Sequence, residues 1–239
     1  MISDNAKIIH EKIENAKIKA GRKNENIIFV GVSKTRTVDE MRESENFIDC
    51  FGENKVQEAE AKKKIYTYSK IPWRLIGHLQ NNKARKAIEL FDFIDSVDSI
   101  ELAERLNRIS GELNKKLRIL IEVNTSLEES KSGVSFENFN ALTEKIISLE
   151  NLRLEGLMTI APLTDDESKI RTAFSNLREL SERAKNFTGL ELPILSMGMS
   201  DDFELAILEG STMVRIGTLL YGARNYNWIH KKWYNKFIK

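Results

Sequence analysis

The sequence predicts an α/β protein built as a single (β/α)8 barrel, with extra helices at both ends of the chain. Short apolar segments rich in β-branched and aromatic residues recur eight times, and amphipathic segments at helical spacing separate them. No Pro- or Gly-rich linker interrupts this order, so one domain over 1–239 is expected. A doubly wound open sheet is the alternative. We favour the barrel because polar clusters follow strand after strand, whereas an open sheet gathers its ligand residues beside one switch point.

The first half of the chain supplies four of the expected strands. An amphipathic helix is expected over 3–20, with Ser3 as its cap and Gly21 after its end. Near-continuous apolar runs then predict strands over 27–32, 47–54, 72–77 and 91–98. Helices are expected to begin near Thr37 and His78 and to span 56–68, where the lysine run 62–64 is predicted to form a solvated face.

The second half repeats the pattern. Ser99 is expected to cap a helix through Leu106 and Ile109, and helical periodicity also covers 136–149, 165–187 and 201–208. Strands are expected over 117–123, 152–158, 192–197 and 212–216. The basic aromatic tail 228–239 is predicted to form a terminal helix.

Composition narrows the class of protein. The 239 residues include 41% hydrophobic residues, which is enough for a sizeable core. The 37 basic and 36 acidic residues nearly cancel, so neither nucleic acid nor a membrane is an expected partner. The N-terminal segment carries charges throughout, so no signal peptide or anchor is expected, and the single Cys50 suits a reducing, cytoplasmic location. With three His and one Cys, no metal site is expected.

The chemistry of the chain is concentrated at the ends of the first and last expected strands. The apolar run 27–32 stops at Lys34, where partial desolvation can free an amine to attack a carbonyl. Glycine and hydroxyl residues after strands seven and eight, Ser200, Gly217 and Thr218, are typical of a phosphate site in a barrel. Arg215 lies inside an apolar strand, where it needs either a structural ion pair or a bound acceptor such as a cofactor ring nitrogen.

Eight segments, in order, resemble the pyridoxal phosphate homeostasis proteins, which are single-barrel relatives of the N-terminal domain of alanine racemase. The segments are VSKT (32–35), FGEN and VQE (51–58), IG, LQ and NK (76–83), SVDS (96–99), EVN and SKSG (122–133), GLMTI (156–160), SMGMS (196–200) and VRIGT with YGAR (214–224). The chain departs from the family pattern at Lys55, where tyrosine is usual, and before the acidic residues of 126–133, where a glycine is often seen.

The resemblance implies a fold type III barrel that binds pyridoxal 5'-phosphate (PLP). Met158, Met197 and Met199 are expected either to line the pocket or to belong to the core. The implied cofactor-binding set is Lys34 as the lysine of the internal aldimine, Asn54 and Met199 beside the cofactor, Arg215 facing the pyridine nitrogen, and Ser200, Gly217 and Thr218 around the phosphate.

The implied function is PLP homeostasis inside the cell. A guanidinium has no proton to give, so a ring nitrogen facing Arg215 stays unprotonated and the cofactor is a weak electron sink. We therefore expect buffering of PLP or its delivery to apo-enzymes, with little or no turnover and no assigned catalytic residue.

Three alternatives remain open at this point. One is a PLP-dependent amino-acid racemase of low activity. The chain ends shortly after the eighth strand, so we expect it to lack the second domain that gives alanine racemase its second base, and we expect a monomer. Another is an aldolase that uses Lys34 without a cofactor. The third is a nucleic-acid or membrane adaptor that uses the basic tail 230–239.

Overall fold

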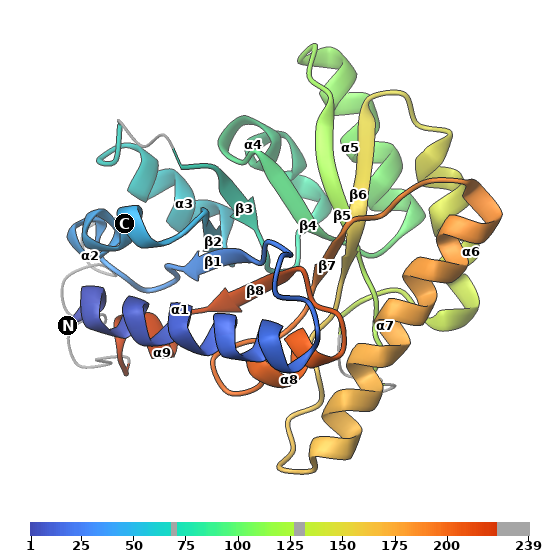
Figure 1. Ribbon diagram of the computed structural model, residues 1–239. Coiled ribbons are helices and arrows are strands. Elements are labelled where there is room, and N and C mark those ends of the chain that lie inside the picture. Colours follow the sequence, from blue (N-terminus) through green and yellow to red (C-terminus); the bar gives the residue numbers. More distant parts are fainter. Residues whose placement is uncertain (68–70, 127–131, 224–239) are drawn as a thin grey trace.

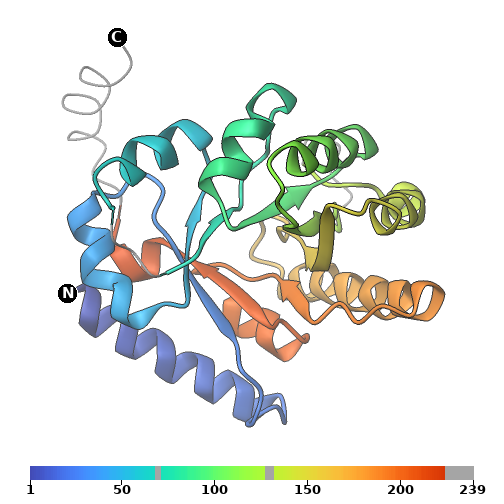
Figure 2. The same ribbon diagram turned by 90° about the horizontal axis from the view of Figure 1, so that it is seen from above.

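Eight parallel strands close into a barrel in the order β1 to β8 in the computed structural model, which describes residues 1–67, 71–126 and 132–223. Figure 2 shows the strands at the centre and the helices around them. The predicted barrel is therefore confirmed. The strands are β1 (Ile28–Val32), β2 (Cys50–Glu53), β3 (Trp73–Leu75), β4 (Phe93–Val97), β5 (Leu117–Glu122), β6 (Leu152–Met158), β7 (Ile194–Ser196) and β8 (Met213–Ile216).

Helices alternate with the strands and form the outer layer (Figure 1). α1 packs against α2, α8 and α9, so the first helix covers the place where β1 meets β8. The helices are α1 (Ile2–Lys19), α2 (Val38–Ser44), α3 (Val56–Lys63), α4 (Ala84–Leu90), α5 (Ile100–Glu112), α6 (Phe136–Ile147), α7 (Glu167–Thr188), α8 (Phe203–Leu208) and α9 (Thr218–Tyr221), with short 3-10 turns at Glu45–Phe47 and Asn81–Lys83.

Side-chain caps explain where several helices begin. Thr37 and Glu40 form a reciprocal capping box at the start of α2, and Ser99 accepts the amide hydrogen of Leu102 as expected. The prediction for Ser3 is wrong: α1 starts at Ile2, Met1 is its N-cap, and no side chain caps it. The expected helix over 228–239 lies outside the described residues.

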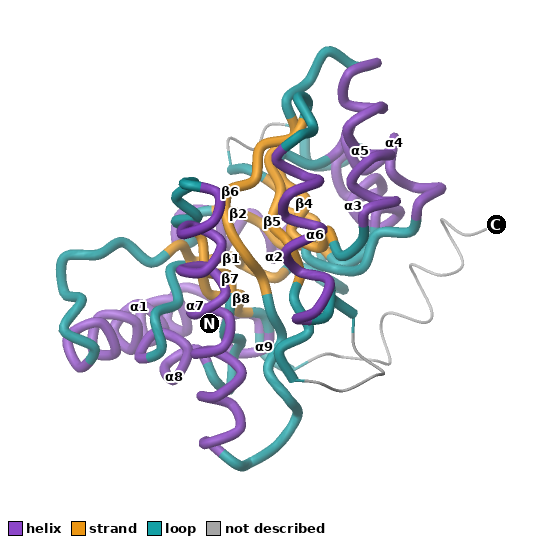
Figure 3. The backbone as a smooth tube through the Cα atoms, turned by 90° about the vertical axis from the view of Figure 1, so that its right-hand side faces the viewer, coloured by secondary structure: helices purple, strands orange, loops and turns teal. Residues whose placement is uncertain are grey.

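The buried apolar residues form two layers, one inside the barrel and one between the barrel and the helices. Figure 3 shows the strands with the helices around them. The inner layer is small and includes Val30, Cys50, Leu120, Met158 and Met213. Cys50 is buried, and desolvation raises the pKa of its thiol to about 12, so it is a core residue rather than a nucleophile. The inner layer is smaller because the barrel also encloses charged residues.

Arg74 and Asp95 make one of these charged contacts. The Arg74 Nε donates to Asp95 Oδ2 at 2.7 Å and its Nη2 donates to Oδ1 at 3.0 Å, so the pair is bidentate. Both side chains are almost fully buried. Replacing one partner alone would leave an uncompensated charge inside the barrel.

The lysine run 62–64 does not form a solvated face throughout, and this prediction is wrong for Lys62. The side chain of Lys62 is 1% exposed and its Nζ lies 2.6 Å from Glu53 Oε1. Lys64 is exposed, as expected. Consecutive helical residues point about 100° apart, so one member of a charged run can face the strands while another faces water.

Candidate functional site

A cavity of about 280 Å³ lies at the carboxyl ends of the barrel strands, where (β/α)8 barrels place their ligand sites. The seven residues predicted to bind a cofactor all line it. The lining residues are Val32, Lys34, Arg36, Asn54, Ile76, Ile160, Met199, Ser200, Asp201, Arg215, Gly217 and Thr218.

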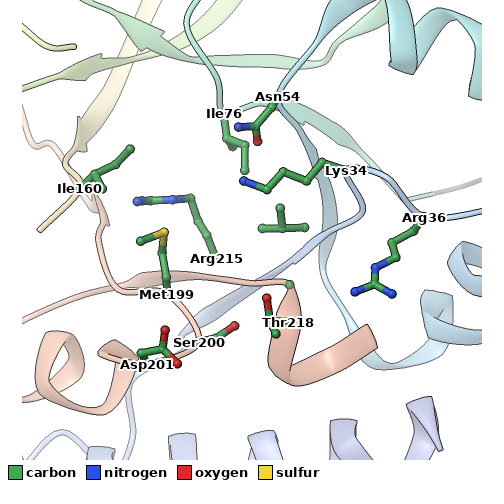
Figure 4. Close-up of a pocket in the computed structure, with 12 residues that line it drawn as sticks. Lys34, Arg36, Asn54, Ile76, Ile160, Met199, Ser200, Asp201, Arg215 and Thr218 are labelled. Carbon is green, nitrogen blue, oxygen red and sulfur yellow. The ribbon is translucent and has the colours of Figure 1, made fainter. Parts of the chain in front are cut away.

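Lys34 enters the cavity from the end of β1. Strand β1 ends at Val32. The next residue, Ser33, still donates its amide hydrogen to the carbonyl oxygen of Gly52 on β2, and Lys34 follows it. Figure 4 shows the half-buried Lys34 side chain extending toward Ile76, with the Asn54 amide beside its Nζ. The amine therefore lies where the strand predicted it, at the rim of the barrel.

Asn54 supplies an acceptor on the same side of the cavity. Its Oδ1 is buried and, within 1–67, 71–126 and 132–223, has no hydrogen-bond partner. A buried amide oxygen without a donor costs free energy, so a ligand that brings a donor would satisfy it.

Arg215 reaches the cavity from β8. Its Nη1 donates to the Ser196 carbonyl at 2.7 Å and to Ser196 Oγ at 2.8 Å, and its Nη2 donates to the Thr159 carbonyl at 2.8 Å. These contacts hold the guanidinium across the cavity from Lys34 (Figure 4).

Arg215 keeps its charge although the barrel interior lowers the pKa of its guanidinium. Burial lowers the pKa of its guanidinium, while the carboxylates of Asp95, Glu122 and Asp202 act in the opposite direction. A guanidinium stays protonated even in such a site, so Arg215 offers hydrogen-bond donors only.

Ser200 and Thr218 lie together at the opposite end of the cavity from Asn54 (Figure 4). The Ser200 hydroxyl accepts the amide hydrogen of Leu219 at 3.2 Å, which ties the loop after β7 to the start of α9. Gly217 precedes α9, and a Cβ there would approach Val32 O to 3.2 Å and Val32 Cβ to 3.3 Å. Thr218 and Met199 are exposed, so this end of the cavity opens to solvent.

Comparisons with known proteins identify the family of this chain. The family model for the alanine racemase N-terminal domain matches residues 9–225. The pyridoxal phosphate homeostasis protein of Aquifex aeolicus is 40% identical over 217 residues, which cover 90% of this chain and 95% of that protein. This chain belongs to the family of pyridoxal phosphate homeostasis proteins.

Solved structures of similar proteins have the same fold. A protein from Bifidobacterium adolescentis is 36% identical with a TM-score of 0.85, and the match covers 92% of this chain and 94% of that one. PipY of Synechococcus elongatus, solved with PLP bound, is 37% identical with a TM-score of 0.77, and the match covers 88% of this chain and 100% of PipY.

Several lining residues of this family member were not predicted from its sequence. Ile76 and Ile160 come from strand-like or loop segments in which an apolar side chain predicts only core, so no signal in one sequence separates them. Arg36 is more informative: it is buried, and it donates to the carbonyl of Tyr221 at 3.2 Å and to that of Gly222. It therefore ties the loop that carries Lys34 to the end of α9.

Burial decides which of the candidate methionines line the cavity, and the structure also places Lys55. Met158 and Met197 are fully buried and belong to the core layers, so of the three methionines only Met199 lines the cavity. Lys55, at the family's usual tyrosine position, is exposed and precedes α3 without lining the cavity. Lys55 therefore contributes no side chain to the lining of this cavity.

Within the described parts of the chain, no group of three or more His, Cys, Asp or Glu side chains could hold a metal ion. None of the described helices is long and apolar enough to cross a membrane.

Proposed function

We propose that this chain binds PLP reversibly through Lys34 and takes part in PLP homeostasis by buffering the cofactor or delivering it to apo-enzymes. The observation that carries the proposal is the arrangement of one cavity. A primary amine from the end of β1, a buried guanidinium from β8, and two hydroxyls from the loop after β7 and the start of α9 converge there. PLP offers an aldehyde, a ring nitrogen and a phosphate, which match these groups in kind.

The chemistry of the cavity fits PLP. When bound, PLP supplies an aldehyde that a primary amine takes up with loss of water, and hydrolysis reverses this. Lys34 would hold the aldehyde carbon through its Nζ. The Oδ1 of Asn54, which has no partner among the residues that the structure describes, would accept a donor at the same end. Met199 would pack against the cofactor at the open side. The PLP-bound structure of PipY, at 37% identity, supports this choice of ligand.

The phosphate would bind at the opposite end. The Ser200 and Thr218 hydroxyls can donate hydrogen bonds to phosphate oxygens, and the absence of a side chain at Gly217 lets the backbone approach them. Asp201 also lines the cavity, but its side chain is exposed, so water screens its charge.

Arg215 would limit any chemistry on amino acids. Its guanidinium can donate to a ring nitrogen but cannot protonate it, so the site does not favour carbanions as a carboxylate partner would. We propose little or no turnover for this reason, and we assign no catalytic residue.

The broader proposals follow from the same function. A protein that buffers or delivers PLP works where apo-enzymes are made, so we propose a cytoplasmic location and apo PLP-dependent enzymes as recipients. We also propose that the chain acts as a monomer, since each residue of the proposed site comes from one chain.

The test is covalent capture of PLP by the purified protein. We expect a visible absorbance band on addition of PLP and a modified Lys34 after borohydride reduction. Lys34→Ala should abolish both, whereas Lys55→Ala, which removes an exposed lysine from the next loop, should change neither. A band that survives in Lys34→Ala would contradict the proposal.

Delivery and turnover are measured separately. Loss of the band when an apo-enzyme is added, with recovery of that enzyme's activity, is the result expected for delivery. Exchange of the α-hydrogen of an amino acid in deuterated water, dependent on Lys34, would instead favour a racemase of low activity.

A further inference from the structure

Helix α3 contacts the backbone on both sides of Lys34. The Lys62 Nζ donates to the carbonyl oxygen of Ser33 at 2.6 Å. A carboxylate oxygen of Glu58, one turn earlier on α3, accepts the amide hydrogen of Thr35 at 2.5 Å. The two side chains are themselves paired, with Lys62 Nζ at 2.8 Å from Glu58 Oε1.

These two contacts determine the direction in which Lys34 points. The Ser33 carbonyl belongs to the peptide unit before the Lys34 Cα, and the Thr35 amide belongs to the unit after it. Peptide units are planar, so their orientations set the two backbone dihedral angles of Lys34. The direction of its Cα–Cβ bond into the cavity is thus set from α3.

The arrangement is costly to maintain. Lys62 also pairs with Glu53 Oε1 at 2.6 Å, and the two side chains are 1% and 0% exposed. Taking both ions out of water costs free energy, and an apolar pair would often pack as well. Burial raises the pKa of Glu53, and the positive charge of Lys62 opposes this change.

Thr35 adds a second cost beside the same lysine. Its φ angle is +65°, a left-handed conformation that a β-branched residue rarely adopts. The Glu58 contact to its amide hydrogen is one of the interactions that hold it there. Buried ions and strained backbone at one position are expected where function requires a geometry that packing alone would not select.

We propose that Lys62 and Glu58 are positioning residues that hold the backbone around Lys34 so that its amine meets the aldehyde of PLP. The proposal rests on the function proposed above, because it presumes that Lys34 is the residue that PLP modifies. It assigns a role to two residues of α3 that do not line the cavity.

Glu58 offers the cleaner test, since its side chain is 20% exposed and its replacement leaves the buried Glu53–Lys62 pair intact. In Glu58→Ala the Thr35 amide loses its acceptor, and we expect capture of PLP to slow by roughly tenfold or more. Glu58→Gln retains an acceptor oxygen and should restore most of the rate. The matched control is Glu60→Ala, which removes a 34% exposed, lysine-paired glutamate from the same helix and should capture PLP at the wild-type rate.

The measurements are the rate at which the absorbance band appears after mixing with PLP and the pH midpoint of that band. A structural role alone would lower the thermal midpoint of the unloaded protein without moving the pH midpoint of the band in the folded variant. Lys62→Met, with exposed Lys64→Met as its control, should shift both the rate and the pH midpoint. If Lys62→Met does not fold, the Glu58 variants decide.

The outcomes separate this inference from the function on which it rests. A wild-type protein without a band would overturn both. The positioning role alone would be overturned by the following result. The band forms in the wild type and in Glu60→Ala and is lost in Lys34→Ala, but its rate of appearance and its pH midpoint are unchanged in folded Glu58→Ala.

Discussion

Glu122 shows how strongly a single residue can respond to the interior of the barrel. It is the last residue of β5, its side chain is buried, and its Oε2 has no hydrogen-bond partner among the residues that the structure describes. Burial raises the pKa of Glu122 from 4.5 to about 7; the charge of Asp98 adds to this, while Arg215 opposes it. The folded protein therefore holds a proton on Glu122 that the unfolded chain releases at a lower pH.

This difference in pKa predicts how stability depends on pH. Between about pH 4.5 and 7 the folded state binds more protons than the unfolded state, so the free energy of unfolding should fall as pH rises through this range. The difference between the folded and unfolded pKa values of Glu122 corresponds to about 3 kcal/mol in the free energy of unfolding, and this stability is lost by about pH 8. Because Glu122→Gln is neutral at every pH, we expect it to be more stable than the wild type at pH 8 by up to about 3 kcal/mol.

Urea denaturation of both proteins across this pH range measures the effect. The exposed Glu191→Gln is the control and should follow the wild-type curve. Equal stability of Glu122→Gln and the wild type at every pH would show that Glu122 is not the group responsible.

At the scale of elements, the approach of β6 to β7 depends on one glycine. Gly156 pairs with Ile194, and a Cβ on Gly156 would lie 1.9 Å from the Ile194 carbonyl oxygen and 2.7 Å from its carbonyl carbon. Both are backbone atoms, which cannot move aside as the end of a side chain can. An alanine would therefore have to separate the two strands.

We expect Gly156→Ala to lower the free energy of unfolding by about 3 kcal/mol or more, because overpacking here displaces backbone. Gly111→Ala adds the same methyl group within α5, where the nearest atom is the Asn151 side-chain amide nitrogen at 2.9 Å. That variant should keep or gain stability, since alanine favours a helix by about 1 kcal/mol over glycine. Chemical denaturation of the two variants gives the comparison, and equal losses would contradict the backbone argument.

Helix α3 illustrates what a local pattern leaves open. Its run of three lysines predicts a solvated face, and Lys64 follows that prediction. Lys62 instead meets Glu53 of β2, because packing of α3 on the barrel turns that one position inward. The short helix α9 was not predicted at all, since four residues are too few to show a helical period.

At the scale of the whole molecule, closure of the barrel assembles the site. β1 pairs with β8 from Ile28↔Met213 to Gly31↔Ile216, which brings residues 34 and 215–218 together although about 180 positions separate them. We propose that residues 1–239 behave as one domain, because an opened barrel would lose both the pairing of β1 with β8 and the layer under α1.

This proposal predicts a single cooperative unfolding transition. Far-UV circular dichroism reports on the helices. Tryptophan fluorescence, to which the buried Trp73 contributes, reports on the packing of the core. The thermal midpoints from the two probes should therefore coincide. Saturating PLP should raise both thermal midpoints together in the wild type. In Lys34→Ala it should raise them only by the contribution of non-covalent binding. Two separated transitions would indicate more than one folding unit.

The sequence by itself determined the barrel, the order of its eight strands, and the position of Lys34, Ser200, Arg215, Gly217 and Thr218 at strand ends. These depend on apolar periodicity and on polar residues at strand ends, which are properties of short segments, whereas Asn54 and Met199 were implied by the resemblance to the family. Only the tertiary structure decided that Met158 and Met197 belong to the core, that Arg36 joins the Lys34 loop to α9, and that Lys62 is buried against Glu53. The neighbours of a side chain depend on how elements distant in the chain pack together, and no local pattern records that packing.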